Sequence, residues 1–460
     1  MLKQFNFKNF LSFDEDEGRT NELSLIGSRV RRHPEQTIKA GDVSLLKAAL
    51  IYGANGSGKS NLIKAIQFMK ACVLRGVPAD TAGLYDRTSR RNQNMPSYFE
   101  MEILLDGICY CYGFELLLAS GSVLCEWLIR KNTSGETVLF ERSTDKGTFR
   151  VGGELEQSNT KDTLGKYLED FQTDQDILLL HVMNRTLKSV LKRNEKLRVF
   201  EDLFLWYARD LNVIWPETSF TNYFQLIEHN PTSALESWLQ AFDTGITRID
   251  HRKVTYDQIS SRLRPEEAQV FRKALDESRT RCHKDPAMKA QALFRTRNDM
   301  YLCHLTAETE KFVQLVFVHQ GTEGDVEFTL ADESEGTIRI LDLLDVLLSE
   351  EEKVFVIDEL DRCLHPNLVY RFVKLFLRKA GCRSQLICTT HESALLDFDL
   401  VRRDEIWFIN KNREGNSHLY SMEEYNERFD KVIEKAYREG RYGGVPVFHS
   451  VFPFEGEEPG

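Results

Sequence analysis

The sequence predicts an α/β fold in which a mixed sheet is accompanied by an antiparallel β subdomain and a helical insertion. Three observations predict it: a phosphate-loop motif between strand and helix signals, a series of alternating strands near residue 100, and a buried strand that ends in two carboxylates near residue 358. The chain has 460 residues, 42% of them hydrophobic, which is enough for about two to three domains with apolar cores.

The phosphate loop matches G-x-x-x-x-G-K-[ST] and consists of Gly53, Ala54, Asn55, Gly56, Ser57, Gly58, Lys59 and Ser60. The apolar run 45–51 predicts one buried parallel strand before the loop, and residues 62–69 have helical spacing after it. Glycines let backbone N–H groups turn inward around phosphate oxygens. We expect Lys59 to reach the β and γ phosphates of ATP and the Ser60 hydroxyl to bind Mg²⁺, and we include Asn61 among the nucleotide-binding residues.

Composition excludes several other classes of protein. No stretch is long and apolar enough to span a membrane, and residues 1–7 alternate like a strand rather than forming a signal peptide, so we expect a cytoplasmic protein with no membrane association. Nine cysteines without a C-x-x-C pair argue against a disulfide framework and a zinc knuckle, and we expect Cys109 and Cys111 to be buried thiols. The net charge of −11 disfavours a surface that binds nucleic acid throughout but leaves a local basic patch open.

Residues 1–160 are predicted to form an N-terminal lobe with the phosphate loop and a β meander. Residues 2–13 read as a first strand. Residues 28–42 read as a mobile polar loop, whose cations Arg29, Arg31, Arg32 and Lys39 indicate either a solvated loop or a surface for nucleotide or nucleic acid. Strands at 98–105 and 108–116 are joined at the turn signal Asp106-Gly107, and strands at 126–130 and 138–141 continue an antiparallel sheet.

Residues 161–310 are predicted to be the helical insertion, because residues 161–297 show amphipathic helical segments and few strand signals. The densest basic run, 184–200, contains Arg185, Lys188, Lys192, Arg193, Lys196 and Arg198. It indicates either a solvated helix face or a surface for phosphates or an acidic partner. The charged helix predicted at 265–281 is too short for a long coiled-coil arm.

Residues 311–450 are predicted to form a C-terminal lobe that ends in an acidic tail at 451–460. We expect strands at 312–318 and 327–330 and a helix at 338–348.

The strand 354–357 delivers Asp358 and Glu359 to its carboxyl end, where open α/β sheets bind ligands. We expect Asp358 to hold Mg²⁺ and Glu359 to polarise the attacking water, the two acids pointing to opposite faces of the strand. A helix from Pro366 stops before Gly381, and a strand at 385–392 brings His391 near the γ-phosphate.

The order of these motifs resembles the ABC-type ATPase head of RecF, SMC and OLD proteins, over roughly residues 1–150 and 310–450. The motifs are the phosphate loop, Ser-Glu-Gly-Thr-Ile-Arg at 334–339, Asp358-Glu359, Leu360-Asp361 and Thr390-His391. The resemblance implies that Ser334 and Gly336 form a nucleotide-binding signature, Asp361 the D-loop, and His391 the switch histidine. The signature departs from the usual Leu-Ser-Gly-Gly, which implies slow or regulated ATP hydrolysis. Neither Gln172 nor Gln175 can be assigned to a Q-loop.

The resemblance also implies partners. In such heads the signature faces the ATP of a neighbouring chain, so we expect a homo-oligomer of at least two chains joined by ATP, with a hexamer left open.

Size, a short insertion and the stretch 435–446 resemble the stand-alone ATPases of bacterial anti-phage (abortive-infection) defence. These control a separate nuclease effector of TOPRIM type, released when a phage-encoded trigger protein is sensed. The alternative is a RecF/SMC-like DNA repair or recombination ATPase that clamps DNA through residues 184–200, and a self-sufficient nuclease is disfavoured because no further acidic cluster is seen.

Overall fold

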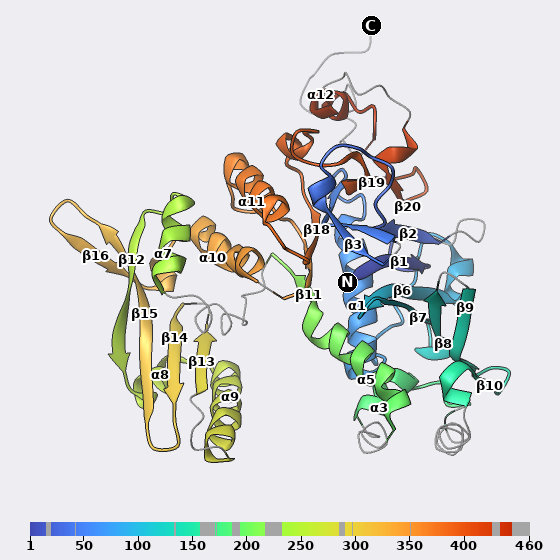
Figure 1. Cartoon of the computed structure of the whole chain (residues 1–460), viewed down its shortest axis with the longest axis horizontal. Helices are drawn as coiled ribbons and strands as arrows, with labels where there is room; N and C mark the ends of the chain where they lie inside the picture. Colours follow the sequence, from blue (N-terminus) through green and yellow to red (C-terminus); the bar gives the residue numbers. More distant parts are fainter. Residues whose placement is uncertain are drawn as a thin grey trace, which may run out of the picture. The chain divides into compact units, whose positions relative to one another are not determined.

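The computed structural model describes residues 1–14, 20–41, 43–132, 135–156, 171, 173–185, 194–216, 232–284, 290–296, 298–349, 351–425 and 433–443 (Figure 1). The chain divides into two compact units. Unit 1 comprises Met1–Val213, Glu351–Leu360 and Leu377–Gly460, and unit 2 comprises Ile214–Glu350 and Asp361–Phe376. These boundaries differ from the predicted ones at 160 and 310, because residues from the C-terminal part of the chain contribute to both units.

The central sheet of unit 1 is mixed. Its strand order is β11 (Leu211–Ile214), β17 (Val354–Ile357), β18 (Gln385–Thr389), β5 (Ala48–Tyr52), β19 (Ile406–Lys411) and β20 (Ser417–Ser421). Strands β17, β18, β5 and β19 are parallel neighbours, and β20 pairs antiparallel with β19. The residues of β17, β18 and β5 are all buried, which explains why these strands read as continuous apolar runs. The predicted mixed sheet is confirmed.

The apolar run before the phosphate loop forms two strands, not the single one predicted. β4 (Val43–Leu46) pairs antiparallel with β3 (Thr37–Ala40), and β5 begins at Ala48. Lys47 separates them and is 6% exposed, with its Nζ 3.4 Å from the carbonyls of Leu377 and Lys379. A lysine can be buried when its ammonium finds acceptors, and acceptors so distant in sequence leave no trace in the local pattern.

A second, antiparallel sheet has the order β10-β9-β8-β7-β6-β1-β2. Its strands are β1 (Leu2–Lys8), β2 (Asn21–Ser24), β6 (Ser97–Leu105), β7 (Ile108–Leu117), β8 (Ser122–Asn132), β9 (Gly135–Ser143) and β10 (Thr148–Val151). The predicted hairpin is confirmed, and its turn residues Asp106 and Gly107 have φ of 48° and 82°. Helix α1 (Lys59–Arg75) packs on this sheet through Phe68, whose ring lies 5.1 Å from that of Phe99.

The Gln385 side chain joins the central sheet of unit 1 to the antiparallel sheet. The N–H of Leu2 in β1 donates to Oε1 of Gln385 in β18 at 2.7 Å, and Nε2 of Gln385 donates to the Leu2 carbonyl at 2.9 Å. The buried side-chain amide of Gln385 therefore makes the same pair of hydrogen bonds to the Leu2 backbone that a neighbouring β-strand would make.

The other elements of unit 1 are short. They are η1 (Pro34–Gln36), η2 (Arg90–Asn94), η3 (Gly153–Glu156), α3 (Leu179–Arg185), η4 (Glu195–Leu197), α5 (Arg198–Leu205), the π-helical turn η5 (Trp206–Asp210), η7 (Ser393–Leu395), η8 (Arg403–Glu405), η9 (Met422–Glu424) and α12 (Ile433–Arg438). Part of the predicted basic run, 186–193, and the acidic tail 451–460 lie outside the described residues. No helix within the described residues is both long and apolar enough to cross a bilayer.

Unit 2 contains a sheet of its own, with the order β12 (Ile246–Val254), β15 (Glu310–Gln320), β14 (Met300–Leu305) and β13 (Ala290–Arg295); β16 (Asp325–Phe328) also pairs with β15. Its helical elements are α7 (Thr232–Ala241), α8 (Tyr256–Arg262), α9 (Pro265–Lys284), η6 (Leu330–Asp332), α10 (Glu335–Leu348) and α11 (Pro366–Arg378). The helices at 265–281, 338–348 and from Pro366 are confirmed. Strands β12 and β13 fall within the stretch that was predicted to be helical.

The charged strand β12 is stabilised by residues that are distant in sequence. Arg248 and Arg252 form ion pairs with Asp325 and Glu327, respectively, across the sheet surface. Strands β12 and β16 pair with opposite edges of β15, so these ion pairs reach across the strand between them. The segment 246–254 has no regular alternation of apolar and polar residues, so a local pattern does not reveal this strand.

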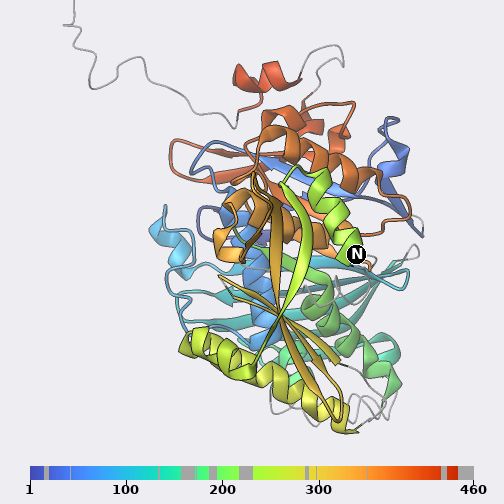
Figure 2. The same ribbon diagram turned by 90° about the vertical axis from the view of Figure 1, so that its left-hand side faces the viewer.

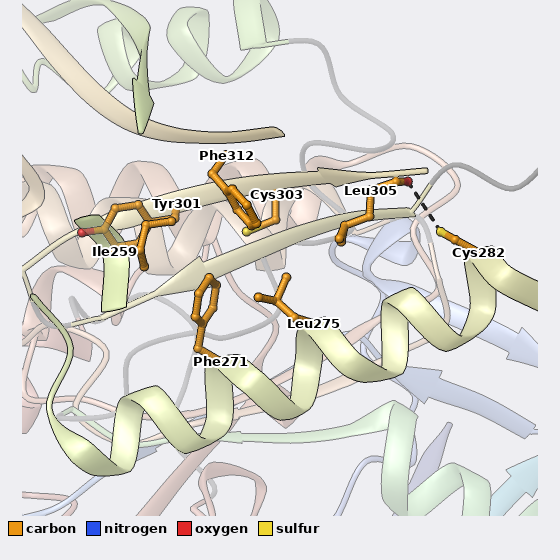
Figure 3. Packing of buried hydrophobic residues seen from close by; sticks show 8 residues of the cluster. All are labelled: Ile259, Phe271, Leu275, Cys282, Tyr301, Cys303, Leu305 and Phe312. Carbon is orange, nitrogen blue, oxygen red and sulfur yellow. Dashed lines mark hydrogen bonds between the residues drawn. The ribbon is translucent and has the colours of Figure 1, made fainter. Parts of the chain in front are cut away.

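The core of this unit lies between α9 and the sheet. Helix α9 lies alongside β13 and β14 (Figures 1 and 2). Figure 3 shows Phe271 and Leu275 of α9 directed toward the strands that carry Tyr301, Cys303 and Phe312. At the end of the helix, Sγ of Cys282 donates to the Leu305 carbonyl at 3.5 Å. The nine cysteines are all free thiols.

Candidate nucleotide-binding site

The phosphate loop connects β5 to α1, as predicted, and its glycines are needed for its shape. A Cβ on Gly53 would lie 2.7 Å from the carbonyl oxygen of Ile409, and Gly58 has a φ of 114° that other residues rarely adopt. Lys59 begins α1 and is 7% exposed. Its Nζ donates to the carbonyls of Gly53 at 2.7 Å and Ala54 at 3.1 Å, so the ammonium is held over the loop.

The two predicted acids follow β17 and are arranged by the neighbouring strand. The Thr389 hydroxyl at the end of β18 donates to Oδ1 of Asp358 at 2.6 Å and accepts from the backbone N–H of Glu359 at 2.8 Å. Asp358 is 4% exposed. Glu359 has a φ of 49°, so the chain leaves the extended conformation there and the prediction that the two acids occupy opposite faces of one strand is wrong.

His391 lies just beyond β18 and is exposed. The segment around it is fixed to the end of β5: the Thr390 N–H donates to the Ile51 carbonyl at 3.1 Å, and the Tyr52 hydroxyl donates to the Glu392 carbonyl at 3.3 Å. Because β17, β18 and β5 are parallel neighbours, their carboxyl ends meet at one edge of the sheet. This edge brings together the phosphate loop, Asp358, Glu359 and the segment that carries His391.

The signature residues and the D-loop lie in unit 2 and contact each other there. Ser334 is the N-cap of α10, and its hydroxyl accepts from the Thr337 N–H at 3.0 Å. A Cβ on Gly336 would lie 2.9 Å from the Cys363 carbonyl oxygen. The turn that begins at Asp361 is closed by the Leu364 N–H, which donates to the Asp361 carbonyl at 3.1 Å.

A polar cleft of about 1120 Å³ lies next to the signature within unit 2. Its wall includes Glu335, Arg339 and Asp342 of α10. Burial lowers the pKa of the Arg339 guanidinium, and the neighbouring Asp342 opposes this shift. Asp342 also forms a buried ion pair with Arg295. The signature is thus bordered by a charged surface rather than by an apolar core.

Sequence reasoning missed three residues at this site. Thr389 orients both acids, and its place at the end of a strand beside Thr390-His391 was a usable signal. Ser12 and Ser417 hydrogen bond to each other under the phosphate loop, at 2.7 Å. Isolated serines at positions so far apart carry no signal in a single sequence.

These elements define an α/β P-loop NTPase. The chain matches the family model described as "AAA domain, putative AbiEii toxin, Type IV TA system" over residues 48–397, and it belongs to this family. A comparison with curated protein sequences finds no match.

Solved structures similar to this chain include three SMC heads. One is the Smc head bound to the C-winged helix domain of ScpA, with 15% identity, a TM-score of 0.41, and 94% of this chain and 99% of that chain covered. The SMC head domain from Thermotoga maritima has 12% identity, a TM-score of 0.34, and coverages of 91% and 98%. The Smc head domain with an extended coiled coil, bound to the C-terminal domain of ScpA derived from Pyrococcus furiosus, has 13% identity, a TM-score of 0.35, and coverages of 96% and 99%.

Proposed function

We propose that this chain binds and hydrolyses ATP with Mg²⁺ and uses ATP to join copies of itself. The observation that carries the proposal is the shared sheet edge in unit 1, where the phosphate loop, Asp358, Glu359 and the His391 segment follow neighbouring parallel strands. An edge of this kind supplies the N–H groups, the ammonium and the carboxylates that a magnesium triphosphate requires.

The residues fit ATP and Mg²⁺ in chemical type. Backbone N–H groups of residues 53–61 and Lys59 would hold the phosphates, and Ser60 and Asp358 would hold Mg²⁺, which prefers hard oxygen ligands. Lys59 would exchange its bonds to the Gly53 and Ala54 carbonyls for phosphate oxygens. Glu359 would accept a proton from the attacking water, and His391 would donate a hydrogen bond to the γ-phosphate.

The second half of the site would come from another chain. Ser334 and Gly336 stand at the N-terminus of α10, where backbone N–H groups and the helix dipole favour an anion. A γ-phosphate bound to the loop of a neighbouring chain would be that anion, with Asp361 beside it. ATP would then join two chains, and its hydrolysis would release them.

Biologically, we propose that the oligomer is the sensor and scaffold of an anti-phage defence system, most like AriA, the ATPase subunit of the PARIS system. It would hold a separate nuclease effector of TOPRIM type inactive and release it when a phage protein is sensed. The family description, which names a toxin of a Type IV TA system, supports a role in defence. Co-expression and co-purification with the products of neighbouring genes test this part, and finding neither a bound effector nor phage protection would count against it.

Mixing two inactive variants tests the composite site. Lys59→Ala lacks a working phosphate loop but keeps the signature, and Ser334→Arg lacks the signature but keeps the loop. Each alone should be inactive. Mixed in equal amounts they should regain about a quarter of the parent ATPase rate, as random pairing into two-fold dimers gives. Recovery of nothing, with both variants folded and paired, would contradict composite sites.

A second function, clamping of DNA, is favoured by exposed arginines on a loop that buried hydrogen bonds hold in place. Arg402 and Asp404 form a buried ion pair, and the Arg402 guanidinium donates to the carbonyls of Val30 and Arg32. These bonds hold the loop in place, and η1 and β3 lie within residues 28–41, so the prediction of an irregular loop is wrong at those positions while its mobility stays a prediction.

The fixed loop exposes Arg29, Arg31 and Arg32, and within the described residues Arg29 and Arg31 form no ion pair. Guanidinium groups fit phosphates well. Duplex DNA binding by the parent and an Arg29→Glu/Arg31→Glu variant should differ in salt slope by about 0.9 per lost phosphate contact. The same reversal at exposed Arg272 and Lys273 of α9 is the control. A parent with no DNA affinity excludes this function.

A further inference from the structure

Two serines far apart in sequence meet beneath the phosphate loop. Ser417, the first residue of β20, places its Oγ 2.5 Å from the carbonyl oxygen of Ser57 and 2.7 Å from Oγ of Ser12. Ser12 Oγ in turn lies 2.8 Å from Nδ2 of Asn61 in the first turn of α1. Ser417 is 1% exposed and Ser12 8%, so these bonds are sheltered from water.

The chemistry of the two ends fixes the direction of this chain of hydrogen bonds. The Asn61 amide nitrogen can only donate, and the Ser57 carbonyl can only accept. Ser417 must therefore give its single hydroxyl proton to Ser57, and Ser12 must give its own to Ser417 while accepting from Asn61. The result is a relay that runs from Asn61 through Ser12 and Ser417 to Ser57.

The relay acts on the backbone at Gly58. In a trans peptide the C=O and N–H point in opposite directions, so a carbonyl of Ser57 bound to Ser417 turns the Gly58 N–H away from Ser417. The serines also pack closely: a Cβ on Gly58 would lie 2.4 Å from Ser417 Oγ and 3.0 Å from Ser12 Oγ. The serine pair therefore leaves no room for a side chain at position 58.

We propose that Ser417 and Ser12 are positioning residues for the nucleotide. By holding the Ser57 carbonyl, they keep the Gly58 N–H aimed to the side of the loop where a phosphate oxygen binds. The inference rests on the proposed ATP site, and the two serines act on the loop backbone, Ser417 directly and Ser12 through Ser417. Since the backbone N–H of Ser417 also donates to the Ser12 carbonyl at 2.7 Å, strand β20 and the segment after β1 are held together as one support for the loop.

Two measurements on Ser417→Ala and Ser12→Ala test the relay. The first is amide hydrogen exchange of residues 53–61 in nucleotide-free protein. We expect the exchange rate at Gly58 to rise in Ser417→Ala. It should rise less in Ser12→Ala, because Ser417 can still donate to the Ser57 carbonyl there. The second is steady-state ATP hydrolysis. The KM of Ser417→Ala should rise about tenfold, the value of one lost hydrogen bond of ordinary strength, with kcat within about twofold of the parent.

Ser421→Ala is the matched control, since Ser421 lies at the other end of β20 and caps η9 instead. It should leave exchange and KM unchanged. Unchanged exchange at Gly58 in Ser417→Ala overturns the relay, and so does an equal rise of KM in Ser421→Ala. A parent that binds no ATP contradicts the proposed function, whereas the exchange result still decides whether the serines hold the loop.

Discussion

The hydroxyl of Thr389 lies 2.6 Å from Oδ1 of Asp358, to which it donates its proton. The Thr389 hydroxyl oxygen also accepts a hydrogen bond from the Glu359 N–H at 2.8 Å, and Thr389 is completely buried. One side chain from β18 therefore sets both the orientation of the carboxylate proposed to hold Mg²⁺ and the backbone turn that presents the proposed water-activating acid. The neighbouring strand would thus support the proposed hydrolysis although none of its side chains takes part in the chemistry.

Thr389→Val should slow ATP hydrolysis about tenfold, because valine keeps the volume but leaves Asp358 and the Glu359 N–H without their shared partner. ATP affinity should change less, since the phosphate loop is untouched. Single-turnover hydrolysis and a nucleotide titration measure the two effects. Thr389→Ser keeps the hydroxyl and should recover most of the rate. Equal rates in the valine and serine variants would remove the role given to this hydroxyl.

Glu359→Gln should bind ATP and hydrolyse it at least about a hundredfold more slowly, because an amide cannot accept the proton of the attacking water. The variant should accumulate the oligomer that ATP closes, which native mass spectrometry with and without ATP detects. Turnover at the parent rate would show that another group activates the water.

Gly336→Ala should weaken ATP-dependent association without weakening ATP binding. The new methyl would lie 2.9 Å from the Cys363 carbonyl oxygen and must displace the turn that carries Asp361. Measured in the Glu359→Gln background, the proportion of ATP-bound dimer should fall about tenfold. Gly83→Ala, where a Cβ meets nothing within 4 Å, is the control and should associate normally. Full association of Gly336→Ala would place the signature outside the interface.

Glu405→Gln should change how stability depends on pH. Glu405 is fully buried, and burial raises its pKa from 4.5 to about 8, although the Arg402 N–H donates to it at 2.9 Å. Between these values the unfolded chain loses this proton while the folded chain keeps it, so stability falls as pH rises through the window. Glutamine removes that fall.

Urea unfolding at pH 5, 6.5 and 8 measures the effect. Relative to the parent, Glu405→Gln should gain stability from pH 5 to pH 8, and the exposed control Glu414→Gln should not. An identical pH dependence in parent and Glu405→Gln would show that Glu405 is ionised in the folded protein.

The sequence predicts those elements whose residues act within a short stretch. The phosphate loop, the strand before Asp358 and the Asp106-Gly107 hairpin are determined by local patterns, and each is present. Lys47, by contrast, interrupts an apolar run through contacts with carbonyls more than three hundred residues away. Its effect on the strands is invisible without the fold.

The candidate site likewise combines features that local sequence reveals with features that only the fold reveals. The residue types and order of Lys59, Asp358 and Glu359 are readable, but the left-handed backbone at Glu359 is set by Thr389 from another strand. Strand β12 was missed because Arg248 and Arg252 find their partners on β16. Contacts between segments distant in sequence, rather than weak propensities, account for the misses.

The position of β5 in its sheet has a consequence for how the protein is made. This strand, finished early in synthesis, lies between β18 and β19, which leave the ribosome some three hundred and forty residues later. A nascent chain therefore carries its phosphate loop without either neighbouring strand while the intervening residues are made, and Leu2 of its first strand waits 383 residues for the Gln385 amide. Chains released before residue 385 should accordingly fail to retain ATP, so that newborn copies stay inactive until β18 and β19 have been made.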